Sequence, residues 1–406
     1  MEHRPLEGIR VLDFTWAWAG PFATLQLAHL GAEVIRIETT TRQICVTRSI
    51  PPFADNQPGA NRAGYFNQYN QGKRSITLNL RNQRAVEMVY ELVKHCDIVT
   101  ENFGAGVSER LGIGYSKLRE FKPDIIMLSI SGFGQTGPAR RFVGYGPVVA
   151  AFAGFFSTTG YIGGDEREIG LSYPDPNAGA HGAFAVLAAL THREATGEGQ
   201  YIDVSMVESA VSMMGEGLLE YQLTGRDPVR NSNRDRVMAP HGCYKAAGDA
   251  DKWVAIAVSS DAEWRSLCVA MERPDLARDE RFVTAEDRKN IEDALDKLVT
   301  DWTCRRDRWE IAEMLQNVGV AAFPAMSNKD LVNDAHLLQR GFLVMKTHPE
   351  VGERTHAGIP WKMVDSPSEV QSAAPLLGAD TEFVLGSLLG YSREKIKQLR
   401  EEGIAA

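Results

Sequence analysis

The first forty residues constrain the fold most, because they read as a strand, a helix and a second strand with very short connections. The strands are expected at Ile9–Phe14 and Glu33–Glu38, and the helix at Pro21–Leu30, closed by Gly31. Two strands joined by such a helix lie parallel, with a right-handed crossover. The same rhythm returns over residues 84–130, so we predict an α/β fold with a Rossmann-like parallel sheet.

This opening unit invites a dinucleotide-binding interpretation, with Glu38 as the residue that would hold a ribose. The turn after the first strand, Thr15–Pro21, reads TWAWAGP. It lacks the G-x-G-x-x-G pattern that lets the backbone approach a pyrophosphate. The turn therefore argues against NAD binding.

Length and charge narrow the class of protein. A chain of 406 residues exceeds what one hydrophobic core usually serves, so two or more domains are expected. A net charge of −9 argues against nucleic acid or an anionic membrane as a partner. An anionic cofactor would then need a local basic pocket.

The five cysteines are scattered and contain no C-x-x-C pair, which predicts neither a disulfide framework nor a zinc site. His241 and Cys243 are spaced like two ligands, but no second pair lies near them, so we predict no metal. The N-terminus lacks a signal-peptide pattern, and the most apolar run, Val148–Phe156, is too short to span a bilayer. We expect a cytoplasmic protein without a membrane partner.

The segment Leu171–Met206 is the most informative part of the chain. Asp175 and Pro176 precede a long Ala-rich helix, which breaks at Thr196–Gly199 before the alternating strand Tyr201–Val204. An Asp at this place is most simply an N-cap, whose carboxylate accepts amide protons of its own helix. It can equally be an ionised carboxylate held in a fixed direction, as a nucleophile must be. Local sequence leaves both interpretations open.

The whole segment resembles the central motif of the class III CoA-transferases. The matching residues are Asp175, Asn177, Gly179, His181, His192-Arg193, Thr196-Gly197 and Gly199-Gln200. The resemblance extends over nearly the whole chain and implies that Asp175 is the nucleophile. In such a reaction fixed donors must meet the tetrahedral oxyanions, and backbone amides of the Gly-rich loops and Asn177 are the candidates.

Three further motifs match the same family: the turn TWAWAGP, the segment NQGKRS before a strand, and ENFGAGVSERLG. The resemblance implies that these segments bind CoA, and one family arginine is replaced by Gly104. The Gly-rich turn Ser131–Pro138 also matches, although it is too loose to be a phosphate loop by itself. The implied CoA-binding residues are Trp16, Ala17, Trp18, Ala19, Lys73, Asn102, Phe103, Arg110 and Tyr145.

From Met238 the sequence pattern changes to an antiparallel pair of strands followed by amphipathic helices, which predicts a small inserted α+β domain. The expected parts are a large α/β domain over 1–205, a linker helix and loop over 206–237, the small domain over 238–328, a linker over 329–350, and a return to the large domain over 351–406. The family resemblance further implies a dimer of interlocked rings. A homologous second subunit is a possible partner.

The resulting prediction is a CoA-transferase that uses CoA thioesters as substrates and holds no permanent cofactor. Its pattern is closest to the branch of succinyl-CoA:benzylsuccinate CoA-transferase, which implies succinyl-CoA as donor, a bulky or aryl-substituted acid such as benzylsuccinate or phenyllactate as acceptor, and a place in aromatic degradation. Two alternatives stay open. One is an acyl-CoA racemase or epimerase, whose catalytic His is matched here by Tyr145 within Gly144–Gly146. The other is a CoA-binding, non-catalytic subunit.

Overall fold

The computed structural model describes residues 3–41, 44–249, 251–367 and 369–405. By its internal contacts the chain divides into two compact units. The first unit comprises Met1–Phe155, Glu168–Asp227 and Ala335–Ala406, and the second comprises Phe156–Arg167 and Pro228–Asp334. The predicted small domain, 238–328, lies inside the second unit, and the C-terminal segment 351–406 lies in the first.

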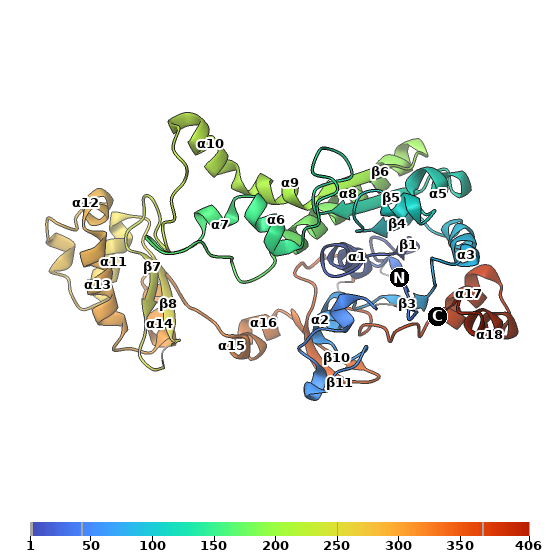
Figure 1. The fold of residues 1–406 in the computed structure, drawn as a ribbon. Coiled ribbons are helices and arrows are strands. Elements are labelled where there is room, and N and C mark those ends of the chain that lie inside the picture. Colours follow the sequence, from blue (N-terminus) through green and yellow to red (C-terminus); the bar gives the residue numbers. More distant parts are fainter. Residues whose placement is uncertain (1–2, 42–43, 250, 368, 406) are drawn as a thin grey trace. The chain divides into compact units, whose positions relative to one another are not determined.

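A parallel sheet of six strands organises the first unit (Figure 1). Its strand order is β3-β2-β1-β4-β5-β6, the order of a doubly wound Rossmann-like sheet. The alternating side chains of β1 show why both faces are covered, since Val11 and Leu12 point to opposite faces and are both fully buried. The strands are β1 (Arg10–Asp13), β2 (Glu33–Glu38), β3 (Arg74–Thr77), β4 (Ile98–Glu101), β5 (Ile126–Ser131) and β6 (Tyr201–Ser205).

Helices cover both faces of this sheet. The amphipathic α3 is capped by the Asn82 side chain, which accepts from the Arg84 amide, and it buries its apolar side against the strands. The helices of the first unit are α1 (Ala19–His29), α2 (Gly64–Tyr69), α3 (Gln83–Val93), α4 (Val107–Arg110), α5 (Tyr115–Phe121), α6 (Gly146–Phe152), α8 (Pro174–Thr196), α9 (Met206–Val211), α10 (Gly215–Thr224), α16 (Ala335–Gln339), α17 (Thr381–Leu389) and α18 (Arg393–Glu401). The short α7 (Phe155–Thr158) falls where the units divide.

The C-terminal tail completes the core of the first unit. Figure 1 shows α17 and α18 beside β3, and their side chains Leu385 and Leu399 are buried in the cluster that contains Ile76 of β3. The Ser75 amide donates to the Asp380 carboxylate at 2.9 Å, which fixes the start of α17 to the strand. A hairpin of β10 (Leu343–His348) and β11 (Gly352–Ala357) precedes this tail.

The second unit is a small α+β body. Its antiparallel sheet runs in the order β7 (His241–Lys245), β8 (Trp253–Ala257) and β9 (Ala321–Pro324). Its core is centred on the fully buried Trp264, which packs against Phe282. The helices are α11 (Asp261–Ala270), α12 (Ala285–Asn290), α13 (Glu292–Thr303), α14 (Arg308–Asn317) and α15 (Asn328–Val332).

One local difference from the sequence prediction lies near the predicted polar turn Phe66–Ser75. Its first part is helical, because α2 spans Gly64–Tyr69. Phe66 is completely buried, with 0% solvent exposure, and the Arg48 guanidinium lies 3.4 Å from its ring centroid. Burial of a single aromatic side chain under a distant arginine carries no local periodicity, so the sequence pattern could not indicate this helix.

The sheet also shows where a ligand should bind. In a doubly wound sheet the crevice opens at the carboxyl ends of the strands where the strand order reverses, here between β1 and β4. The turn after β1 and the turn after β4 are joined there by two hydrogen bonds. The Trp16 amide donates to Asn102 Oδ1 at 2.7 Å, and Asn102 Nδ2 donates to the Trp16 carbonyl at 2.8 Å.

Candidate active site

Asp175 does not cap its own helix. Helix α8 begins at Pro174 and Tyr173 occupies the N-cap position, so Asp175 lies within the first helical turn. The simple N-cap interpretation of this residue is therefore wrong. Helices α1 and α8 pack very closely, because a Cβ on Gly179 would lie 2.6 Å from the Ala19 carbonyl oxygen. The bare backbone at Gly179 brings the first turn of α8 to the start of α1.

The carboxylate of Asp175 lies in a half-buried setting. Burial raises the pKa of Asp175 to about 7, against the opposite effect of the Ala19 amide and of its own amide. The expectation of a carboxylate kept fully ionised by a helix N-terminus is thus corrected, because loss of hydration outweighs those amides. The pKa instead lies near neutrality, as suits a group that must be both reactive and reversible.

Gly146 forms the opposite wall of this carboxylate. A Cβ at Gly146 would lie 2.3 Å from Asp175 Oδ2 and 2.4 Å from Ser172 Cβ. Only a residue without a side chain fits there. Gly146 begins α6, and the preceding Tyr145 is 71% exposed at the N-cap position.

A group of packed aromatic rings stands near Asp175. The ring centroid of Trp18 lies 5.6 Å from that of Tyr65 and 5.2 Å from that of Tyr69, and the two tyrosines are 5.4 Å apart. Burial raises the pKa of Tyr65, with smaller effects of Tyr69 and of the Asp175 charge. Trp18 is only 5% exposed, so it backs the two half-buried tyrosines.

The indole of Trp16 lies elsewhere. It lines an apolar cavity of about 340 Å³ at the carboxyl ends of β1, β2 and β3, together with Phe14, Leu78 and Phe103. Ala17, between the two tryptophans, has a φ of 56°, a left-handed conformation that lets the indoles take different directions. Trp16 therefore lines this cavity, whereas Trp18 packs against Tyr65 and Tyr69.

A larger cavity of about 630 Å³ joins four of the nine predicted CoA-binding residues. It is lined by Asn102, Phe103, Arg110 and Tyr145, and by the segment from Arg140 to Gly144. Phe103 also lines the apolar cavity, so the two cavities adjoin. Since Tyr145 precedes Gly146, the larger cavity leads towards Asp175.

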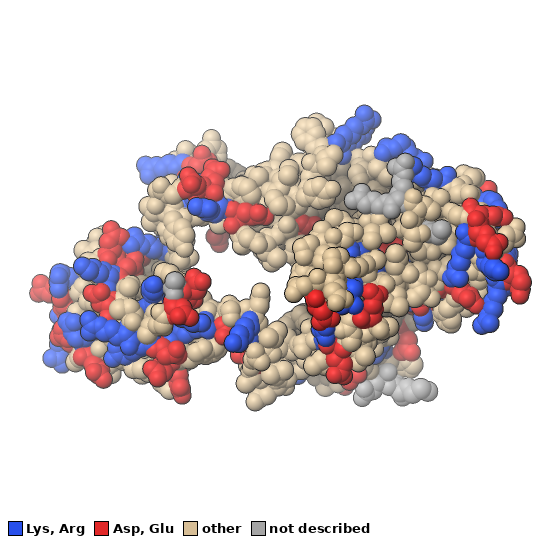
Figure 2. All heavy atoms as spheres, turned by 60° about the horizontal axis from the view of Figure 1, so that its bottom comes forward, with Lys and Arg blue, Asp and Glu red and all other residues tan. Residues whose placement is uncertain are grey.

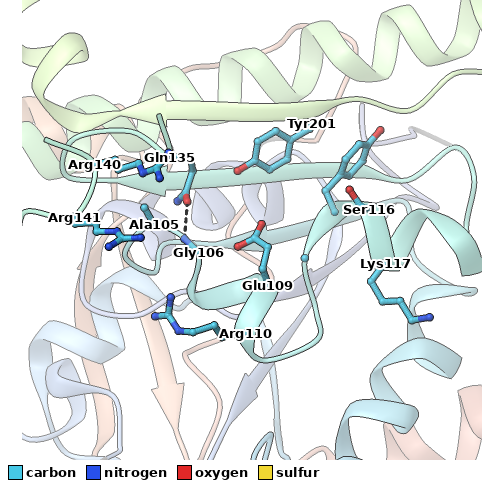
Figure 3. A pocket seen from close by; sticks show the side chains of 12 residues that line it. Ala105, Gly106, Glu109, Arg110, Ser116, Lys117, Gln135, Arg140, Arg141 and Tyr201 are labelled. Atoms are coloured by element: carbon cyan, nitrogen blue, oxygen red, sulfur yellow. Dashed lines mark hydrogen bonds between the residues drawn. The ribbon is translucent and has the colours of Figure 1, made fainter. Parts of the chain in front are cut away.

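Arg110, Arg140 and Arg141, which we call the arginine group, line both this cavity and a neighbouring cavity of about 550 Å³. Figure 3 shows them around Ala105 and Gly106. Within the described ranges none of them has an ion pair with a carboxylate, whereas elsewhere Arg10 and Arg193 do. On the face that Figure 2 shows, acidic and basic side chains are mixed. The arginine group differs from this pattern, because it gathers three positive charges without a described carboxylate partner in a chain whose net charge is −9.

Lys73 is not available to a cofactor. Its ammonium is buried and donates to the Pro21 carbonyl at 2.9 Å, to Thr24 Oγ1 at 2.8 Å and to Asn70 Oδ1 at 3.0 Å. Burial lowers the pKa of Lys73 to about 7, and Asp13, 3.6 Å away, opposes that effect. The structure does not support the predicted contact of Lys73 with CoA, because its three donors are used inside the fold.

Asn177 is also engaged, since its Nδ2 donates to the Ser209 carbonyl at 2.8 Å. It is therefore a poor candidate for an oxyanion donor.

Four site residues were not predicted from the sequence: Arg140, Arg141, Tyr65 and Tyr69. The adjacent arginines just after a Gly-Pro turn were a signal, whereas nothing local marked the tyrosines.

Among the described residues no group of three or more His, Cys, Asp or Glu side chains is arranged to hold a metal ion. No described helix combines the length and the apolar character needed to cross a bilayer.

Comparison with known proteins shows extensive similarity. The model of CoA-transferase family III matches residues 6–381. Succinyl-CoA:mesaconate CoA-transferase of Haloarcula hispanica is 36% identical, over 92% of this chain and 93% of that protein. The alpha subunit of succinyl-CoA–L-malate CoA-transferase of Chloroflexus aurantiacus is 34% identical, over 99% and 93%. The crystal structure of a CAIB/BAIF family protein from Brucella suis superposes with a TM-score of 0.86 at 28% identity, over 95% and 99%.

Proposed function

Because the chain belongs to CoA-transferase family III, we propose that it moves CoA from succinyl-CoA to a carboxylic acid through a covalent intermediate on Asp175. The observation that carries the proposal is the half-buried Asp175 carboxylate, which lies beside the Ala19 amide at the start of α1 and against the backbone of Gly146. Succinyl-CoA as donor is supported by the names of the two relatives.

The reaction requires two exchanges at Asp175. A carboxylate oxygen attacks the donor thioester carbonyl, CoA leaves as thiolate, and a mixed anhydride forms. The thiolate then attacks the aspartyl carbonyl, which releases succinate and leaves an aspartyl-CoA thioester. The acceptor carboxylate attacks this thioester and expels the thiolate again, and the thiolate attacks the acceptor carbonyl to give the product and free Asp175.

The backbone amide of Ala19 is the fixed donor for this chemistry. It interacts with the Asp175 carboxylate and lies at the positive end of α1. A donor at that place stabilises the oxyanion that forms on the aspartyl carbonyl when the thiolate, and later the acceptor carboxylate, attacks it. The close approach of the Gly146 backbone restricts the orientation of the Asp175 carboxylate.

For CoA we propose a binding site along the two adjoining cavities. The arginine group offers guanidinium donors without carboxylate partners, which suits phosphates. The apolar cavity with Trp16 and Phe103 offers stacking surface for the adenine ring. Asn102, Phe103 and Tyr145 line the path from the phosphates towards Asp175.

For the acceptor we propose an acid with an aryl or other bulky apolar group. The support is the group of Trp18, Tyr65 and Tyr69, whose half-buried tyrosine rings stand within electrostatic reach of Asp175. Burying one aromatic ring is worth roughly 2 kcal/mol, about thirtyfold in specificity. Trp16 takes no part in this proposal, since it lines the apolar cavity.

The nucleophile is tested by trapping. Incubation with succinyl-CoA followed by hydroxylamine should leave a hydroxamate on Asp175, seen by peptide mass spectrometry. Asp175→Ala should fold and lose transfer, while Asp227→Ala, at an exposed loop position, serves as the matched control. Full transfer by Asp175→Ala would refute the mechanism, and CoA binding without any transfer would favour a non-catalytic subunit.

The acceptor is tested by steady-state comparison. Benzylsuccinate and phenyllactate are compared with mesaconate, L-malate, oxalate and carnitine, each with succinyl-CoA as donor. A preference for a small acid that stays unchanged in Trp18→Ala would show that the aromatic group only packs. The predicted interlocked dimer, with a homologous second subunit as the alternative, is tested by the mass of the purified protein in solution and by its activity alone.

A further inference from the structure

The arginine group comes from two different segments of the chain. Arg110 ends the short helix α4, whereas Arg140 and Arg141 follow the Gly-rich turn after β5. No described carboxylate forms an ion pair with these guanidinium groups, so no acidic side chain fixes the distances between them. Their spacing must be set by whatever fixes the two segments relative to each other.

Gln135 is the side chain that joins these segments. Its Oε1 accepts from the Gly106 amide at 3.2 Å, the bond drawn in Figure 3, and its Nε2 donates to Ser129 Oγ at 2.9 Å. Gly106 is the N-cap residue of α4, with a φ of 73°. The bond therefore ties the start of the helix that carries Arg110 to the turn that leads to Arg140.

The anchor behind Gln135 is a row of side chains across three strands. Glu101, Ser129 and Asp203 are register partners on β4, β5 and β6. Ser129 donates to Glu101, which is 1% exposed and also accepts from the Phe103 amide at 2.6 Å. The backbone amide of Gln135 donates to Asp203 Oδ2 at 3.0 Å. Gln135 is thus fixed to the rigid sheet by backbone and side chain.

We propose that Gln135 is a positioning residue, which holds Arg110 at the distance from Arg140 and Arg141 that lets all three meet the phosphates of CoA. The inference rests on the proposed function, because it takes CoA as the ligand. An amide suits this place, since it accepts from Gly106 and donates to Ser129 at once. A carboxylate could not make the second bond and would add charge beside Glu109 and Asp203.

The test separates the phosphates from the rest of CoA. Calorimetric titrations with CoA, 3′,5′-ADP and pantetheine are made for wild type, Gln135→Ala and the control Gln83→Ala, an exposed glutamine on α3. Gln135→Ala should bind CoA and 3′,5′-ADP about tenfold more weakly, as for a lost hydrogen bond that orients charged donors. Pantetheine binding should stay unchanged, and KM for succinyl-CoA should rise much more than kcat falls.

A variant that carries Arg110→Gln, Arg140→Gln and Arg141→Gln shows whether Gln135 acts through those side chains. In that background Gln135→Ala should cause no further loss of CoA affinity. An equal loss for pantetheine, an additive loss in that background, or wild-type protein that binds neither CoA nor 3′,5′-ADP would overturn the inference. CoA binding with the expected loss but no transfer would instead refute the proposed function alone.

Discussion

The raised pKa of Asp175 leads to a prediction that links stability to catalysis. A carboxyl group whose pKa is higher in the folded than in the unfolded protein binds its proton more readily when folded. Stability is then lost as pH rises from the ordinary value, 3.8, to about 7, and the loss is complete above that range. Asp175→Asn removes the ionisation, so it should relieve this cost at high pH only.

The size of the effect follows from the pKa values. A rise from 3.8 to about 7 corresponds at full burial to roughly 4 kcal/mol, at about 1.4 kcal/mol for each tenfold change in acidity. Asp175 is half-buried and water screens part of its charge, so we expect about 2 kcal/mol. Wild type and Asp175→Asn should be equally stable near about pH 4, and the variant should be more stable above about pH 7.

The assay is urea unfolding of both proteins across this pH range, followed by circular dichroism. In parallel, kcat/KM of wild type should fall about tenfold for each pH unit below about 7, because only the ionised carboxylate attacks. A difference in stability that does not change with pH would refute the reasoning. So would a flat activity profile between about pH 5 and 7, since ionisation would then not limit the reaction.

Three further predictions concern Gly146, Lys73 and Tyr145. Gly146→Ala should lower kcat by about a hundredfold, since its Cβ would lie 2.3 Å from Asp175 Oδ2 and displace it, whereas Gly215→Ala, at the start of α10 with no atom within 4 Å, should leave steady-state rates unchanged. Lys73→Met should lower the free energy of unfolding by about 3 kcal/mol, because Asp13 then keeps only the more distant Arg36, 3.8 Å away, as a buried cationic partner, while calorimetry of the folded variant should show wild-type CoA affinity. No solvent deuterium should enter the carbon beside the thioester carbonyl, as followed by NMR, because Tyr145 stands where a racemase-type base would be; uptake that depends on Asp175 would favour the racemase alternative.

The sequence reached the fold through patterns that burial itself imposes. Strand Glu33–Glu38 has the bounds that were predicted for it, and the helix that begins at Pro174 ends at the predicted glycine, Gly197. Both signals are local, since β-branched residues such as Val34 and Ile35 favour a strand and a left-handed C-cap favours glycine. The helix Gly64–Tyr69 was not predicted, because only Phe66 marks its buried side.

The candidate site divides in the same way. Motif resemblance named Asp175, Asn102, Phe103, Arg110 and Tyr145, and the structure brings the last four to one cavity. Motif resemblance also named Lys73, because a lysine beside a glycine turn has the chemistry to meet a phosphate. Whether its ammonium faces solvent or the interior depends on Pro21, Thr24 and Asn70, which approach it only after folding.

The sequence by itself determined the alternation of strands and helices, the family and which carboxylate is proposed as the nucleophile, because periodicity, turn residues and motifs are properties of neighbouring residues. Only the tertiary structure decided what that carboxylate experiences. Its pKa depends on burial against Ala19 and Gly146, which lie far from it in the chain. The arginine group likewise exists only because two separate segments meet at Gln135, since charge and hydration depend on distances in space.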